Sequence, residues 1–175
     1  ASTVIGTVAP LRAEKNIGWM IESFSRVAAA GTARLLIVGD GPTRRTLEAM
    51  AQASPAADRI HFAGYIGQPE KVFGLMDVFA MSSDTEQMPN ALLQAMAAGR
   101  PVISTDVGDV RPIVSAGNRD FVFPVGDAAG YDRGLAAMIA DRELRTRLGS
   151  ANRQRAVDIY SMDKMLAAYR KLLLP

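Results

Sequence analysis

Short, largely apolar segments alternate along the chain with longer segments whose apolar residues recur every three or four positions. The short segments predict β-strands, and the longer ones predict amphipathic helices. Six strands are expected, at residues 4–8, 34–38, 60–63, 78–81, 101–105 and 121–123. Because a helical segment follows each of them, the pattern favours a mostly parallel sheet that is buried on both faces.

The expected helices cover residues 16–30, 42–53, 69–76, 89–98, 109–115 and most of 128–173. In the first, the apolar residues from Ile17 to Val27 share one face, and Gly31 ends the helix. Right-handed crossovers then give a doubly wound, Rossmann-like α/β domain with helices on both faces. No linker or repeat interrupts the pattern, so a single domain is expected to fill residues 1–175.

Ligands of doubly wound sheets bind at the carboxyl ends of the strands. Five loops are expected to share this edge, at residues 10–16, 39–42, 64–67, 82–89 and 105–109. The candidate ligand-binding residues lie in these loops.

The composition is that of an ordinary globular domain, with 49% hydrophobic and 22% charged residues among 175. No apolar stretch approaches the ~20 residues of a membrane-spanning helix, and no signal peptide is expected. The absence of cysteine excludes disulfides and thiolate metal sites and fits a reducing compartment. The single histidine, His61, lies between apolar residues, which favours a structural role over a catalytic one.

The formal net charge is only +2, and basic residues are densest at Arg142, Arg145, Arg147, Arg153 and Arg155. Acidic residues interrupt this basic segment and no aromatic platform accompanies it, which argues against nucleic-acid binding. A solvated helix face is the favoured interpretation. Contact with an anionic membrane surface is the alternative.

Two of the loops carry groups suited to an anionic ligand. The glycines of GDGP, at residues 39–42, would let a phosphate approach the backbone, but a tight turn explains the segment equally well. The segment lacks the third glycine of a dinucleotide fingerprint and the Lys-Ser/Thr of a P-loop. Lys15 and Arg12, in the first loop, could reach an anion or remain solvated.

Glu86 stands just before a helix that begins near Pro89, where free backbone amides attract phosphate. Its carboxylate could accept hydrogen bonds from sugar hydroxyls, together with Gln94 about two turns further on. The alternative is a charge that stabilises the helix N-terminus by about 0.3–1 kcal/mol. No Ser-His-Asp or Cys-His arrangement and no paired carboxylates are evident, so the sequence offers binding groups but no general base.

Taken together, these motifs resemble the C-terminal domain of the GT-B retaining glycosyltransferases of family 4, the glycosyl transferases group 1. The strongest match is EQMPNALLQAMAAGRPVI at residues 86–103. The segments LRAEKN at 11–16, LIVGDGP at 36–42, FAGY at 62–65 and TDVGD at 105–109 support it in the same order. The resemblance covers essentially the whole chain and implies one half of a GT-B fold.

The resemblance implies two catalytic residues: Lys15 would neutralise the diphosphate of a nucleotide-sugar donor, and Glu86 would hold hydroxyls of the transferred sugar. The candidate donor-binding residues are Arg12, Gly39, Gly41, Tyr65, Ile66, Gln87, Met88, Pro89, Asn90 and Gln94. Tyr65 and Ile66 would lie by the nucleobase and Gln94 by the ribose. The chain departs from the family pattern at Pro10, Gln87 and Gln94, where the family has arginine, glycine and glutamate.

The implied function is donor binding for retaining hexosyl transfer to a glycan or lipid-linked acceptor. No metal or other cofactor is expected, because Lys15 and helix amides would neutralise the diphosphate. The resemblance further implies an N-terminal acceptor domain, which is expected to lie outside this chain. The fragment is therefore expected to bind a nucleotide sugar without transferring sugar alone, and the apolar face of residues 162–173 is expected to be exposed or paired.

The resemblance also implies a cytoplasmic enzyme of cell-surface glycan biosynthesis, with peripheral association of the full-length enzyme with the inner face of the membrane. Two alternatives stay open. One is a sugar-nucleotide epimerase of the same fold. The other is a non-catalytic relative with a degraded donor site.

Overall fold

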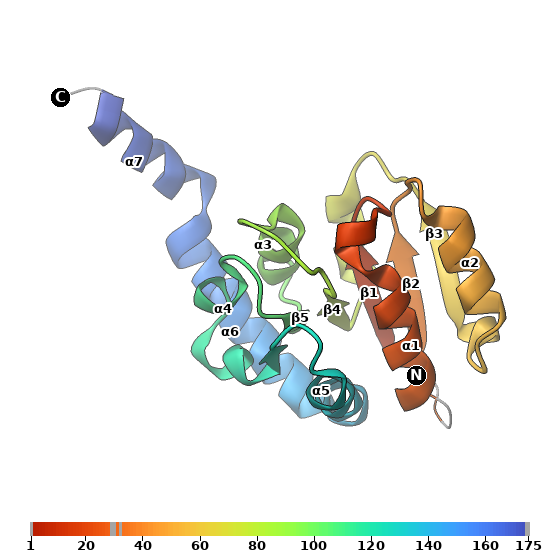
Figure 1. Ribbon diagram of the computed structural model, residues 1–175. Helices are drawn as coiled ribbons and strands as arrows, with labels where there is room; N and C mark the ends of the chain where they lie inside the picture. Colours follow the sequence, from red (N-terminus) through yellow and green to blue (C-terminus); the bar gives the residue numbers. More distant parts are fainter. Residues whose placement is uncertain (1, 29–30, 32, 174–175) are drawn as a thin grey trace.

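Six parallel strands form the central layer of the protein (Figure 1), and the computed structural model describes residues 2–28, 31 and 33–173. The strands are β1 (Val4–Val8), β2 (Arg34–Val38), β3 (Ile60–Gly64), β4 (Val78–Ala80), β5 (Val102–Thr105) and β6 (Val122–Phe123). Their order is β3-β2-β1-β4-β5-β6, and each neighbouring pair is parallel. This order is that of a doubly wound Rossmann-like sheet, as the sequence predicts.

The α-helices are α1 (Ile17–Val27), α2 (Arg44–Gln52), α3 (Asn90–Ala97), α4 (Val110–Ile113), α5 (Ala128–Ala140), α6 (Arg142–Tyr160) and α7 (Met162–Leu173). The helix expected at residues 16–30 ends at Val27, and residues 29 and 30 lie outside the described residues. The helix expected at 42–53 begins only at Arg44, because the Thr43 amide and hydroxyl both donate to the Leu11 carbonyl.

Two 3-10 turns, Pro69–Lys71 and Phe73–Leu75, replace the helix expected at residues 69–76. Gly74 lies in the second turn, and glycine disfavours an uninterrupted α-helix. The expected strand and helix order is otherwise confirmed.

Helices cover both faces of the sheet, which explains why the strands are largely apolar. On one face, α1, α2 and α5 supply buried side chains such as Phe24, Leu47 and Leu135. On the other face, the second core cluster draws buried residues such as Leu92 and Val110 from α3 and α4, together with the 3-10 turns and α6. With both faces closed, a ligand can reach the sheet only at its edges.

Tyr131 links α5 to the strand end that leads into the ligand-binding edge. Its ring is fully buried and its hydroxyl donates to the Met81 carbonyl at 3.1 Å. Burial raises the pKa of the phenol, so the hydroxyl stays protonated and remains a donor. The bond thereby satisfies a buried carbonyl next to the loop that follows β4.

Tyr131→Phe is expected to lower the free energy of unfolding by about 1 kcal/mol, because the Met81 carbonyl loses its buried partner. Urea denaturation of the wild type and the variant measures this. Tyr65→Phe is the matched control, since Tyr65 is 79% exposed and should change stability by less than about 0.5 kcal/mol. Equal effects of the two substitutions would contradict the structural role of the hydroxyl.

The basic segment is only partly a solvated helix face. Arg145 donates to the carbonyls of Met138 and Ile139, and Arg155 donates to those of Ile113 and Pro112. The prediction of a solvated face is therefore wrong for Arg145 and Arg155, which cap the ends of α5 and α4. It holds for Arg142, Arg147 and Arg153, which are exposed.

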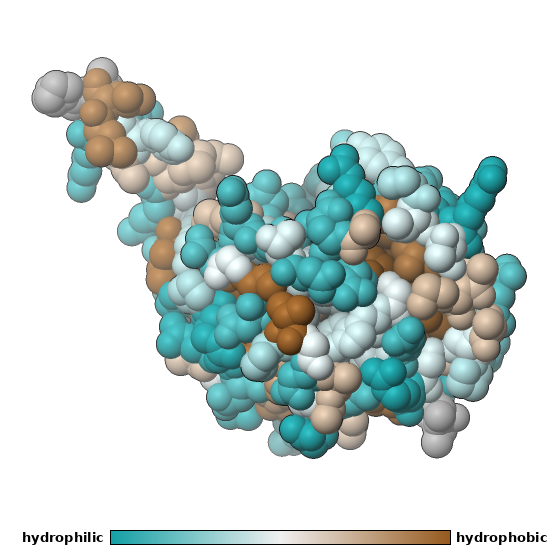
Figure 2. Space-filling model, in the orientation of Figure 1, coloured by the Kyte–Doolittle hydropathy of each residue, from teal (hydrophilic) through white to brown (hydrophobic). Residues whose placement is uncertain are grey.

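The last helix, α7, projects from the body of the protein (Figures 1 and 2). None of its residues is buried, and its exposed apolar side chains include Met162, Leu166 and Tyr169. This confirms that the apolar face of residues 162–173 is exposed in this chain. No helix within residues 2–28, 31 and 33–173 combines the length and apolar composition that a membrane crossing needs.

Candidate functional site

The candidate site lies at the switch point of the sheet. From β1 the chain continues outward to β2 and β3, whereas β4 leads outward in the other direction to β5 and β6. The connections that follow β1 and β4 therefore lead in opposite directions along the sheet, which leaves a crevice at the carboxyl edge between these two strands. Such crevices are the usual ligand sites of doubly wound sheets, and the expected loops meet here.

Hydrogen bonds hold the loop after β1 against the loop after β4. The Asp84 amide donates to the Glu14 carbonyl at 2.9 Å, and the Ser82 hydroxyl donates to the Lys15 carbonyl at 2.9 Å. Asn16 has a positive φ of 46° and donates its side-chain amide to the Asp84 carboxylate at 2.9 Å. These bonds fix the backbone on both sides of the crevice.

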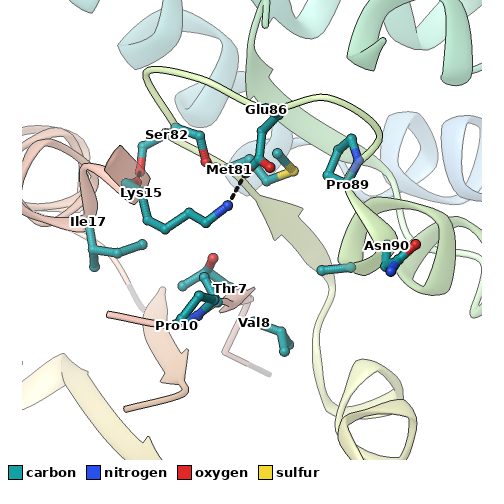
Figure 3. A pocket seen from close by; sticks show the side chains of 13 residues that line it. Thr7, Val8, Pro10, Lys15, Ile17, Met81, Ser82, Glu86, Pro89 and Asn90 are labelled. Atoms are coloured by element: carbon teal, nitrogen blue, oxygen red, sulfur yellow. Dashed lines mark hydrogen bonds and ion pairs between the residues drawn. The ribbon is translucent and has the colours of Figure 1, made fainter. Parts of the chain in front are cut away.

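A pocket of about 210 Å³, the Lys15–Glu86 pocket, opens between these loops (Figure 3). It is lined by Thr7, Val8, Ala9, Pro10, Lys15, Ile17, Met81, Ser82, Ser83, Glu86, Pro89, Asn90 and Ala91. Apolar side chains form much of its wall, and the Lys15 ammonium and Glu86 carboxylate meet inside it. Asn90 and Ala91 begin α3, whose first backbone amides lack partners within the helix.

Lys15 and Glu86 form a tight ion pair. The Nζ of Lys15 lies 2.6 Å from Oε1 of Glu86, and the two side chains are only 17% and 13% exposed. The Ser83 hydroxyl donates to the same Oε1 at 2.7 Å. Oε2 of Glu86 receives no hydrogen bond from the described part of the chain. One carboxylate oxygen is thus fixed, and the other can accept from a ligand hydroxyl.

Ser83 positions the carboxylate and is itself held by the sheet. The Thr105 hydroxyl, at the end of β5, donates to the Ser83 carbonyl at 2.6 Å. Ser83 and Thr105 are both buried. The sequence does not reveal this role of Ser83, since a serine three residues before a carboxylate carries no distinctive signal.

Ser83→Ala is expected to weaken the binding of a nucleotide sugar about 5-fold, because Glu86 loses one of the two groups that orient it. Binding of the parent nucleoside diphosphate should change less than about 2-fold. Calorimetric titration of both ligands checks this, with Ser161→Ala, a serine between α6 and α7 that does not line the pocket, as the control. An equal loss for both ligands would contradict a role through Glu86.

Gly108 supports Glu86 from the loop after β5. Its φ is +51°, and a Cβ on this residue would lie 2.4 Å from the Gln87 carbonyl oxygen and 2.5 Å from that of Glu86. The next residue, Asp109, donates its amide to the Gln87 carbonyl at 2.9 Å. Only glycine lets the loop approach so closely. The TDVGD motif contains this residue, but the sequence does not show which backbone it touches.

A second pocket of about 370 Å³, the Tyr65 pocket, adjoins the first. It is lined by Val8, Ala9, Pro10, Val38, Gly39, Asp40, Tyr65, Ile66 and Pro69. Val8, Ala9 and Pro10 line both pockets, so the two form one cleft along the carboxyl edge. The Tyr65 pocket is mainly apolar, and the Tyr65 ring is 79% exposed at its margin. It offers a surface for a flat, partly apolar group.

The glycines of GDGP serve close packing of the backbone. A Cβ on Gly39, whose φ is +140°, would lie 1.8 Å from the Ala9 carbonyl oxygen, and one on Gly41 would lie 2.4 Å from that of Leu11. Gly39 also lines the Tyr65 pocket, whereas Gly41 does not. Both interpretations of this segment therefore have support. The Gly41 amide, together with Arg44, holds the pKa of Asp40 below its usual value.

Several predicted residues lie outside both pockets. The side chains of Arg12, Gln87 and Met88 are exposed and line neither pocket. Gln94, one turn of α3 beyond Asn90, is also exposed and also lines neither pocket. Asn90 and Ala91, at the start of α3, do line the Lys15–Glu86 pocket. Contact of a ligand with the Gln87 and Met88 amides stays a prediction. His61 is exposed on β3, near Arg34, and also lies outside both pockets.

The described residues contain no group of three or more His, Asp or Glu side chains that could hold a metal ion. The cleft instead holds the Lys15 ammonium and the first backbone amides of α3, which carry partial positive charge. That the reaction needs no metal stays a prediction.

Comparison with known proteins shows which protein family the chain resembles. The model of the family described as glycosyl transferases group 1 matches residues 2–141. The lipopolysaccharide core biosynthesis glycosyltransferase LpsE of Rhizobium meliloti is 31% identical over 159 residues, which cover 91% of this chain and 46% of LpsE. The N-acetyl-alpha-D-glucosaminyl L-malate synthase of Bacillus anthracis is 26% identical over 165 residues, 94% of this chain and 43% of that enzyme. The chain thus spans about half the length of these relatives.

Solved structures share the fold at low sequence identity. Staphylococcus aureus TarM, in complex with UDP and other ligands, matches with a TM-score of 0.89 and 17% identity, covering 99% of this chain and 36% of TarM. Anabaena HepE in complex with UDP matches with a TM-score of 0.87 and 18% identity, covering 99% of this chain and 49% of HepE. The close agreement between this chain and these structures confirms the predicted fold, one Rossmann-like half of a GT-B architecture.

Proposed function

The chain belongs to the group 1 glycosyltransferases, and from this we propose that it is the donor-binding half of an enzyme that transfers a hexose from a nucleoside diphosphate sugar. The observation that carries the proposal is the Lys15–Glu86 pair at the switch point, with an apolar pocket beside it. A cation for diphosphate, a carboxylate for hydroxyls and an apolar surface for a base are the three parts that such a donor needs.

The donor would extend along the cleft. The nucleobase would occupy the Tyr65 pocket, and the diphosphate would lie near Pro10, where Lys15 and the amides at the start of α3 can reach it. The sugar would fill the Lys15–Glu86 pocket and donate a hydroxyl to the open Oε2 of Glu86. The UDP in the HepE and TarM structures supports a nucleotide donor at this type of fold.

Lys15 would also act in the transfer step. Negative charge grows on the diphosphate as its bond to the sugar breaks, and the Lys15 ammonium together with the α3 amides would stabilise that charge without a metal. Glu86 keeps Lys15 in place while the other two N–H groups of the ammonium remain available for phosphate oxygens. The transfer would retain the anomeric configuration of the hexose.

The relatives are about twice as long as this chain. The acceptor site would lie in an N-terminal domain of the full-length enzyme, as the family resemblance implies. The exposed apolar face of α7 would be covered in the full-length enzyme by that domain. The chain alone would bind donor without transferring sugar. The acceptor would be a glycan or a lipid-linked glycan at the cytoplasmic face of the membrane, which is consistent with the lipopolysaccharide role in the name of LpsE.

The reported relatives are glycosyltransferases and related synthases, which supports transfer rather than the epimerase alternative. The ion pair and its supporting hydrogen bonds support a working donor site rather than a degraded one.

Calorimetric titration with UDP, GDP and ADP and their hexose conjugates tests the proposal. We expect one nucleotide series to bind with a dissociation constant between about 1 µM and 1 mM, the range in which KM values of enzyme substrates usually lie. Full-length enzyme with the same donor and a glycan acceptor then tests transfer. Absence of binding in every series at about 10 mM would overturn the donor-binding assignment.

A further inference from the structure

A third cavity lies at the opposite edge of the sheet from the proposed donor cleft. It has a volume of about 280 Å³ and is lined by Asp77, Gly99, Arg100, Pro101, Arg142, Arg145, Thr146 and Ser150. Asp77 and Pro101 directly precede β4 and β5, so the cavity sits at the amino ends of these strands. We name it the arginine cavity.

Two of its arginines are held rigidly by backbone carbonyls. Arg100 donates to the Ala98 and Met76 carbonyls at 3.0 and 2.6 Å, and Arg145 donates to those of Met138 and Ile139 at 2.6 and 3.0 Å. Neither guanidinium donates through Nη2 to any described residue. Each therefore keeps N–H groups free on a fixed fork, and such forks match the oxygens of phosphate.

The arginines have no counter-ion of their own. Within the described ranges, no ion pair includes Arg100, Arg142 or Arg145. The one carboxylate in the wall, Asp77, accepts the Val4 amide at 2.8 Å. Three positive groups thus face one negative group, and the unbalanced charge favours a bound anion.

The first turns of α6 complete the wall. Arg142, Thr146 and Ser150 follow one another at four-residue spacing, so they share one face of the helix. The amino end of α6 adds the positive end of a 19-residue helix dipole. At about 30 Å³ for each water, the cavity could hold several waters, which leaves room for a phosphate and an attached group.

We propose that the arginine cavity is an accessory binding site for a phosphate ester or pyrophosphate, separate from the donor cleft. The phosphate oxygens would accept from Arg100, Arg142 and Arg145, and Ser150 would donate a hydroxyl hydrogen bond. The same chemistry is found in soluble phosphate compounds and in the headgroup of phosphatidic acid. This site does not depend on the proposed function of the donor cleft.

An NMR titration with pyrophosphate tests the site, because it resolves the two edges of the sheet. The amides of Gly99, Thr146 and Ser150 should shift with a dissociation constant below about 1 mM, independently of the Asn90 amide in the donor cleft. Arg142→Gln should weaken the affinity for pyrophosphate, measured from these shifts, about 10-fold through loss of a charge-assisted hydrogen bond. Arg142 is exposed and makes no side-chain bond to a described residue, so its replacement should leave the fold intact.

Arg147→Gln is the matched control, since it removes the same charge from an exposed position of α6 outside the cavity. It should change pyrophosphate binding less than about 2-fold.

Co-sedimentation with phosphatidylcholine vesicles, with and without phosphatidic acid, shows whether the ligand is a lipid headgroup or a soluble phosphate compound. Binding that needs phosphatidic acid and Arg142 indicates a lipid headgroup, and binding of pyrophosphate alone indicates a soluble ligand. No ligand-dependent shift at about 10 mM and no vesicle binding, or an equal loss in both variants, would overturn the site.

Discussion

Replacing Lys15 with alanine is expected to weaken the binding of the cognate nucleoside diphosphate about 10- to 100-fold. The ammonium supplies charge-assisted hydrogen bonds worth about 1.5–3 kcal/mol, and each 1.4 kcal/mol corresponds to about 10-fold in affinity. The variant also leaves Glu86, whose side chain is 13% exposed, without its cationic partner. The unpaired carboxylate would then repel the diphosphate. Calorimetric titration measures the loss.

Two further variants separate these effects. Lys164→Ala removes an exposed lysine of α7 and should leave the affinity within about 2-fold of the wild type. Lys15→Ala combined with Glu86→Gln should bind diphosphate more tightly than Lys15→Ala alone, because the repelling charge is gone. If Lys15→Ala bound diphosphate as tightly as the Lys164 control, the diphosphate would not lie beside Lys15.

Gly108→Ala is expected to lower the free energy of unfolding by about 2–5 kcal/mol. Alanine at a positive φ costs about 1–2 kcal/mol, and forcing a methyl group against packed neighbours adds about 1–3 kcal/mol. The new Cβ would press on the Glu86 and Gln87 carbonyl oxygens at 2.5 and 2.4 Å. The loop that carries Glu86 must then move. The variant should lose the extra affinity for the sugar conjugate while it still binds the diphosphate.

Gly126→Ala provides the matched comparison. Gly126 also has a positive φ, of +86°, but a Cβ there would meet no atom within 4 Å. Its replacement should cost only the backbone strain of about 1–2 kcal/mol and leave donor binding unchanged. Urea denaturation and calorimetry of both variants measure the difference. Equal destabilisation by the two substitutions would show that the contact between Gly108 and the Glu86 loop carries no energy.

The fold was largely predictable because its strands are short apolar runs separated by clear helical patterns. β1 and β2 have the predicted limits, since Pro10 follows β1 closely and the GDGP turn follows β2 directly. The start of α2 was not predictable, because it depends on a contact between Thr43 and the Leu11 carbonyl, 32 residues away in sequence. Helix ends that depend on such tertiary contacts leave no local pattern.

The candidate site was predictable at the level of loops. Parallel topology brings Lys15 and Glu86 to one edge although they are 71 positions apart. Their direct ion pair was not predicted, because side-chain direction depends on how the two loops are bonded together. The roles of Gly108 and Ser83 were missed for the same reason. Arg145 was read as a surface charge because the sequence does not show the carbonyls that it caps.

The most direct test of donor recognition compares one nucleoside diphosphate with its hexose conjugate, by calorimetry on the wild type and on Glu86→Gln. We predict that the wild type binds the conjugate about 10-fold more tightly, through a charge-assisted hydrogen bond from a sugar hydroxyl to Glu86. Glu86→Gln should lose that difference while its affinity for the diphosphate is unchanged or higher, since a negative charge has been removed. If Glu86→Gln kept the full preference for the conjugate, Glu86 would not hold the sugar, and the donor-binding account of this cleft would be contradicted.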